Sequence, residues 1–254
     1  MKRKLVENLK RVEDRIQAAC NRADRPRDSV TLVAVTKTLT LDVIRAMVDM
    51  GFTDLGESRV QELTRRAAAI DEWLGRRARD VAAGAKPRPR WHMVGHLQRN
   101  KIKTLLPWVD TIHSMDSLRL AEELHAHAEK TGTVVPAFVE VNVSEEPNKH
   151  GVRVAAAFHL VEIIQGLDHL KVIGLMGMAP HTEDTDQIRR AFTRLSELYD
   201  EIIDERVAGE HFRCLSMGMS NDFEIGIELG ATHVRIGSAL FAGIELAPQA
   251  VPAE

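Results

Sequence analysis

Short apolar runs alternate with longer amphipathic stretches along most of this chain. Each short run has the length and residue content of a β-strand bounded by turns. The predicted strands are Leu32–Thr36, Asp54–Gly56, His92–Gly95, Thr111–His113, Ala137–Val143, Val172–Gly174, Cys214–Leu215 and His233–Ile236. Helices are predicted between them, at Leu41–Met50, Arg59–Leu74, Leu118–Lys130 and Gln187–Glu205.

The amphipathic stretches carry their apolar residues at helical spacing. In the last predicted helix one face is apolar, with Ile188, Phe192, Leu195, Tyr199 and Ile202. The N-terminal segment shows the same spacing and predicts an amphipathic surface helix, with Leu5, Leu9, Val12, Ile16 and Ala19. This segment is too charged for a signal peptide, and no apolar run approaches the roughly 20 residues that span a bilayer. No membrane partner is therefore expected.

Strands that alternate with helices predict a parallel sheet. Eight such units in 254 residues favour closure into one (β/α)8 TIM-type barrel, so residues 1–254 are predicted to form a single domain. The one break in composition is Arg76–Arg90, a basic stretch rich in Ala, Pro and Gly, which we interpret as a solvated loop insertion.

The charge and the cysteine content limit which partners, metal sites and compartments are expected. The net charge of −3 gives no electrostatic reason to expect a nucleic-acid partner. Cys20 and Cys214 are the only cysteines, which provides neither a metal-binding spacing nor a disulfide framework. Two free thiols are typical of a reducing compartment, so a cytoplasmic location is expected.

Candidate chemistry gathers at the predicted strand ends. Lys37 follows the first strand directly, and barrel enzymes carry their chemistry at the carboxyl ends of the strands. Small residues with free backbone N–H groups follow the last two strands within Leu215–Phe241, as expected of a phosphate site. A lysine and a phosphate site on one rim favour a phosphorylated carbonyl compound held as a Schiff base. Alternatively, Lys37 simply extends from a strand end into solvent.

Several sequence blocks in order carry a family resemblance. They are LVAVTKT around Lys37, then GESRVQE, WHMVGHLQRNK, HSMDS, VEVNVSEEPNKHGV, GLMGMAP, LSMGMSNDFEIGI and VRIG. Through almost its whole length the chain resembles the pyridoxal phosphate homeostasis proteins, single-barrel relatives of the alanine racemase N-terminal domain of fold type III. The resemblance implies that Lys37 carries pyridoxal 5'-phosphate (PLP) as a Schiff base.

The resemblance also implies roles for five more residues. The Ser216 hydroxyl, the Met217 backbone and the Gly237 and Ser238 amides are expected to hold the phosphate, while Arg235 faces the pyridine nitrogen. The sequence departs from the family pattern at three places. Ser58 stands where asparagine is usual, and the two side chains differ in reach near the cofactor. Ser238 replaces a threonine but keeps its hydroxyl, and Arg76–Arg90 is longer and more basic than the family pattern.

Arg235 bears on the chemistry because a guanidinium donates and never accepts a proton. A ring nitrogen beside it stays largely unprotonated, which makes the cofactor a weaker electron sink. Decarboxylation and transamination are therefore disfavoured, while racemisation remains conceivable. The alternative is that Arg235 pairs with a buried carboxylate.

Racemisation needs an acid–base group on each face of the cofactor. In the related racemases the second group is a tyrosine from another domain, but Tyr199 lies on an apolar stripe and no sequence follows Glu254. His92, His96 and His113 are the possible substitutes. The spacing of His92 and His96 also suggests a metal site, but the two flank a strand and a turn and no third ligand is evident, so no metal is expected.

We therefore expect a monomeric PLP-binding protein rather than an enzyme. By resemblance it would act in PLP homeostasis, by buffering or by delivery to PLP-dependent apoenzymes. The alternatives are a low-activity amino-acid racemase and a barrel aldolase that uses Lys37 on a sugar phosphate.

Overall fold

The computed structural model describes residues 1–78 and 87–244. Its strands are β1 (Thr31–Val35), β2 (Asp54–Glu57), β3 (Arg90–Met93), β4 (Thr111–Met115), β5 (Val135–Asn142), β6 (Val152–Arg153), β7 (Leu170–Gly177), β8 (Cys214–Ser216) and β9 (His233–Ile236). Its α-helices are α1 (Lys2–Arg22), α2 (Leu41–Asp49), α3 (Val60–Ala78), α4 (Ile102–Leu105), α5 (Leu118–Thr131), α6 (Val154–Ile164), α7 (Thr185–Asp204) and α8 (Phe223–Glu228). Two 3-10 turns are η1 (Arg27–Ser29) and η2 (Arg99–Lys101).

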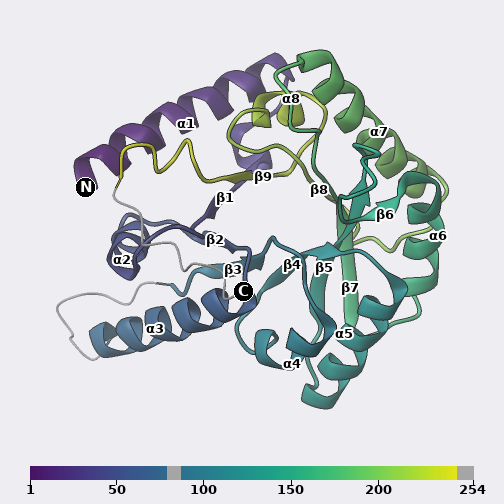
Figure 1. The fold of residues 1–254 in the computed structure, drawn as a ribbon, viewed down its shortest axis with the longest axis horizontal. Coiled ribbons are helices and arrows are strands. Elements are labelled where there is room, and N and C mark those ends of the chain that lie inside the picture. The colour runs from purple at the N-terminus through teal and green to yellow at the C-terminus, as the bar shows by residue number, and fades with distance from the viewer. Residues whose placement is uncertain (79–86, 245–254) are drawn as a thin grey trace.

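Eight parallel strands close into a barrel. Their hydrogen-bonded order is β4-β3-β2-β1-β9-β8-β7-β5, and a pairing between β4 and β5 completes the ring. Figure 1 shows this ring of strands with the helices arranged outside it. The predicted TIM-type barrel is thus confirmed, and each predicted strand matches one of these eight. The two-residue strand β6 was not predicted because it adds only a short pairing beside β5.

The predicted helices are also present. Helix α1 buries one face, including Leu5, Val12 and Ile16, as its amphipathic spacing indicates. It lies outside the barrel beside α8 (Figure 1). The buried Asn8 Nδ2 donates to the carbonyl oxygens of Leu240 and Ala242, at 2.9 and 3.0 Å, and so ties α1 to the chain after β9.

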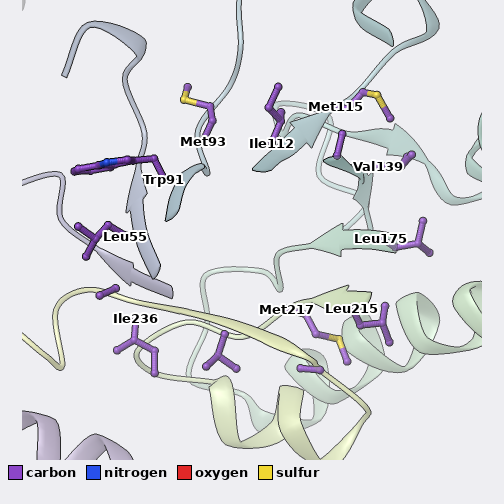
Figure 2. Packing of buried hydrophobic residues seen from close by; sticks show 14 of the residues in the cluster. Leu55, Trp91, Met93, Ile112, Met115, Val139, Leu175, Leu215, Met217 and Ile236 are labelled. Carbon is purple, nitrogen blue, oxygen red and sulfur yellow. The ribbon is translucent and has the colours of Figure 1, made fainter. Parts of the chain in front are cut away.

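Strand residues alternate between the two faces of the barrel wall. Apolar side chains such as Leu55, Trp91, Ile112, Leu175 and Ile236 are fully buried between the strands and the helices. Figure 2 shows them on the outer side of the strands, away from the centre of the ring. Many of the alternate, inward positions are polar, among them His92, His113, Ser216 and Arg235, and Phe138 packs on His113 there. Branched apolar layers usually fill such barrels.

The basic stretch Arg76–Arg90, predicted to be a loop, begins within a helix and ends at the first residue of a strand. Helix α3 continues to Ala78, residues 79–86 lie outside the described residues, and Arg90 begins β3. At its ends Arg77 pairs with Asp49 at 2.9 Å and Arg88 with Asp71 at 3.1 Å. Within the described part of the chain, no helix is long and apolar enough to cross a membrane.

The close approach of β7 and β8 requires a glycine at position 174. A Cβ on Gly174 would lie 1.7 Å from the carbonyl oxygen of Cys214. We predict that Gly174→Ala lowers the free energy of unfolding by about 2 kcal/mol or more, because the two strands must separate. Gly75 is the control, since a Cβ there meets nothing within 4 Å in helix α3.

Gly75→Ala should raise the free energy of unfolding by about 0.5–1 kcal/mol, as expected for an exposed helical position. Urea titration followed by circular dichroism measures both variants. Equal stability of Gly174→Ala and the wild type would contradict the described approach of β7 and β8.

Candidate functional site

A cavity of about 770 Å³ opens at the carboxyl ends of the barrel strands. This volume lies in the range of small-molecule and cofactor sites. Four of the six residues predicted to bind a cofactor line it: Lys37, Arg235, Gly237 and Ser238. Further lining residues include Ser58, Lys149, His181, Ser220 and Asp222. The carboxyl ends of β1 and β9, which are neighbours in the sheet, therefore both border the cavity.

Lys37 is exposed, and the turn that carries it is held from below. The buried Arg66 donates to the carbonyl oxygens of Thr36 and Leu39, at 2.5 and 2.9 Å. Arg66 also forms a buried ion pair with Glu57, which accepts a hydrogen bond from the Thr36 hydroxyl at 3.1 Å. Burial raises the pKa of Glu57, and the nearby Arg66 opposes that rise. A buried pair whose arginine also bonds both carbonyls fixes the backbone on each side of Lys37.

Two backbone amides after β9 converge on one oxygen. The N–H groups of Gly237 and Ala239 donate to the Ser220 hydroxyl, at 3.3 and 3.2 Å. Amides that converge in this way form an anion-binding concavity, in which the Ser220 oxygen takes the place an anion oxygen could occupy. In the same loop the Asp222 carboxylate accepts from the Met219 N–H at 2.5 Å. Sequence analysis missed Ser220, although it lies in the same block of small residues.

Ser216 and Met217 do not line the cavity. The Ser216 hydroxyl is fully buried inside the barrel, because the side chain points inward from β8. The Met217 side chain is also buried, and its N–H donates to the His233 carbonyl at 3.1 Å. The structure therefore brings four of the six predicted residues together and places these two beneath them.

Arg235 connects the cavity with the barrel interior. Its guanidinium donates to the Ser216 hydroxyl at 2.6 Å and to the Gly177 carbonyl at 3.1 Å. Among the described residues no carboxylate forms an ion pair with it. Burial lowers the pKa of Arg235 to about 10, an effect opposed by the carboxyl groups of Glu140 and Asp222. Arg235 therefore remains a cation at neutral pH and keeps hydrogen-bond donors for a ligand.

A hydrogen-bonded chain runs from Arg235 through the barrel interior. Beyond Ser216, His113 Nδ1 lies 2.9 Å from the hydroxyl, and His113 Nε2 lies 3.0 Å from His92 Nδ1. His92 Nε2 in turn lies 3.0 Å from Asp54 Oδ1. Arg235 can only donate and an ionised Asp54 can only accept. The Ser216 hydroxyl therefore accepts from Arg235 at one end of this series, and His92 Nε2 donates to Asp54 at the other.

Ionisable side chains in and beside this hydrogen-bonded chain have shifted pKa values. Burial, reinforced by His92, His233 and Arg235, lowers the pKa of His113 well below its usual value. Burial and the nearby His92 lower the pKa of His233 to about 4. Burial alone would raise the pKa of Asp54, but hydrogen bonds from His92 and Arg90 outweigh it and hold that pKa far below the usual range. The imidazole of His113 is thus neutral and the Asp54 carboxylate is charged at neutral pH.

Glu140 is the other ionisable group of the barrel interior. Burial, with a smaller contribution from Asp116, raises the pKa of its carboxyl to about 7, although the nearby Arg235 opposes the rise.

The residues considered as a second acid–base group lie away from the cavity lining. His92 and His113 point into the barrel and form hydrogen bonds there. Tyr199 is half-buried outside the barrel, with its ring stacked on Phe212 at 5.3 Å, as its place on an apolar stripe predicts. His96 lies on the rim beside Asp116.

The chain is similar in sequence and in fold to several known proteins. The sequence profile of the family described as the alanine racemase N-terminal domain matches residues 8–244. The pyridoxal phosphate homeostasis protein of Aquifex aeolicus is 41% identical over 236 residues, which cover 92% of this chain and 96% of the relative. A crystal structure of an unknown protein from Bifidobacterium adolescentis matches with a TM-score of 0.85 and 39% identity, covering 94% and 95% of the two chains. PipY of Synechococcus elongatus, solved with PLP bound, matches with a TM-score of 0.74 and 28% identity over 91% of this chain and all of PipY.

The lowered pKa of His233 predicts acid destabilisation. From pH 6.5, the usual pKa of histidine, down to about 4, the unfolded chain binds a proton at this residue and the folded chain does not. Because only the unfolded chain binds this proton, the free energy of unfolding decreases as the pH falls through this window. We predict that His233→Gln makes the decrease in free energy of unfolding between pH 7 and pH 4.5 smaller.

The glutamine amide can keep the contact that His233 Nδ1 makes with the Thr232 hydroxyl at 2.9 Å. His159→Gln is the control, because His159 is largely exposed. Urea titrations at several pH values provide the measurement. An identical pH dependence in His233→Gln and the wild type would show that His233 does not titrate differently in the two states.

Proposed function

The chain belongs to the pyridoxal phosphate homeostasis proteins of the alanine racemase N-terminal domain family, and we propose that it binds PLP and acts in PLP homeostasis. One observation carries this proposal. Lys37, Arg235 and the residues Gly237 and Ser238 after β9 border a single cavity at the carboxyl rim of the barrel. When bound, PLP supplies a reactive aldehyde and a phosphate, and this cavity has groups suited to each.

We propose that Lys37 binds the aldehyde. Its amine would form a C=N bond to the aldehyde carbon as a Schiff base, and the carbonyl oxygen would leave as water. The buried pair of Arg66 and Glu57 supports this assignment because it fixes the turn on both sides of Lys37.

The Gly237 and Ser238 amides would hold the phosphate, with the Ala239 amide and the Ser220 hydroxyl close by. Ser216 and Met217 would act from beneath: Ser216 by orienting Arg235, and Met217 by holding the strand that precedes the Ser220 turn.

Arg235 favours binding over catalysis. It would direct a donor toward the pyridine nitrogen, so that nitrogen would not be protonated and carbanion formation would gain little. The low-activity racemase alternative gains no support from Tyr199, which packs against Phe212. The three histidines considered as a second acid–base group, His92, His96 and His113, do not line the cavity, whereas His181 does. We therefore propose a protein that buffers or delivers PLP without sustained turnover.

PLP-dependent apoenzymes would receive the cofactor from the open rim of the barrel, and the protein would act as a monomer. Cys20 and Cys214 are free thiols, which supports the cytoplasm as the compartment.

We predict that the wild-type protein with added PLP shows a visible absorption band that borohydride abolishes, and that Lys37→Ala lacks this band. Lys149→Ala is the matched control. Lys149 lines the same cavity, but its amine is engaged by Glu146 and by the Ala179 carbonyl, so the band should persist. A colourless wild type, or a band that survives Lys37→Ala and disappears in Lys149→Ala, would contradict the assignment.

The same samples separate binding from catalysis. Alanine in deuterated water should keep its α-proton in the presence of the loaded protein, while PLP should transfer to an added apoenzyme. Exchange of the α-proton at a rate of sustained turnover, lost in Lys37→Ala, would favour the racemase instead.

A further inference from the structure

Three possible metal ligands meet on the rim beside the cavity. They are His96, which follows β3, Asp116, which follows β4, and His150, in the loop after β5. Their ligand atoms all lie within 4.8 Å of one another. We propose that these residues bind a divalent transition-metal ion, represented by Zn²⁺.

The chemistry of the donor set suits this class of ion. Two imidazoles and one carboxylate form a common three-ligand set for catalytic zinc and for related transition metals. Bonds of about 2.0–2.2 Å place tetrahedral donors roughly 3.5 Å apart. His96 Nδ1 and Asp116 Oδ2 are already separated by 3.4 Å. The His96 and His150 rings stack at 4.1 Å, and both side chains are exposed enough to rotate toward a shared ion.

The backbone and a neighbouring side chain hold this cluster in place. Ser117 donates its hydroxyl to Asp116 Oδ1 at 3.2 Å, which leaves Oδ2 directed toward His96. An outer hydrogen bond of this kind is typical of carboxylates that ligate metals. His150 precedes Gly151, which has a φ of +107° and sits where a Cβ would lie 2.7 Å from the Asn142 N atom. That close contact with the end of β5 fixes the backbone that carries His150.

The position of the cluster gives a bound ion access to the cavity. Val94 and Lys149, close neighbours in sequence of His96 and His150, line that cavity. Three protein ligands leave at least one coordination position for water or for an anionic group. The ion would therefore present a Lewis acid at the edge of the cavity.

Sequence spacing alone argued against a metal, because His92 and His96 flank a strand and no third ligand is evident. The structure separates the two: His92 points into the barrel toward Asp54, whereas His96 joins Asp116 and His150 on the rim.

Isothermal titration with Zn²⁺ tests this site on the purified protein after treatment with a chelator and without added cofactor. We expect saturable binding of one ion to the wild type. Asp116→Asn preserves the shape of the side chain, and both it and His150→Ala should weaken binding by about tenfold or more. Co²⁺ should give visible absorption that Zn²⁺ displaces and that Asp116→Asn abolishes.

His159→Ala is the matched control. His159 lies 3.3 Å from the Glu162 carboxylate and so forms an exposed histidine–carboxylate pair. Its removal should leave Zn²⁺ affinity unchanged. The proposal is overturned if the wild type binds no Zn²⁺ saturably, if Asp116→Asn binds as tightly as the wild type, or if His159→Ala weakens binding equally. Because the metal alone is the probe, each outcome is independent of whether PLP binds.

Discussion

The hydrogen-bonded chain from Asp54 to Arg235 is the constraint on which the interior of this barrel depends. Its members come from β2, β3, β4, β8 and β9, so the chain is complete only when the barrel is closed. Each buried polar group that lost its partner would cost about 1–3 kcal/mol. The hydrogen-bonded chain begins at the Asp54 carboxylate, which only accepts, and ends at the Arg235 guanidinium, which only donates. It therefore holds Arg235 in one orientation at the floor of the cavity.

Stability and function are divided between the two faces of the same strands. The outward residues, such as Leu55 and Ile236, pack against the helices and supply the apolar core, while the inward residues form the polar network beneath the site (Figure 2). Alternation along each strand produces this division. Lys37 depends on a second buried polar unit, because Arg66 and Glu57 hold the turn on either side of it. The first unit orients the Arg235 guanidinium, and the second fixes the backbone that carries Lys37.

The sequence predicts the barrel well because apolar runs and helical spacing are local signals. It also predicts Lys37, Arg235 and Gly237, which follow or occupy strands whose ends meet on one rim. It does not reveal the side to which Ser216 points, because that depends on register across β7 and β8. The Ser220 hydroxyl is not revealed either, because its contacts with the Gly237 and Ala239 amides depend on the path of the loop after β8. The cluster of His96, Asp116 and His150 arises from three loops that only the closed barrel brings together.

Identification of the lysine that carries the cofactor tests the central claim most directly. The protein would be loaded with PLP, reduced with borohydride and digested, and the modified peptide identified by mass spectrometry. The structure places an exposed Lys37 and an engaged Lys149 in one cavity. We predict that Lys37 is the dominant site of modification. A modification on Lys149, or one spread over surface lysines while Lys37 is unmodified, would contradict it.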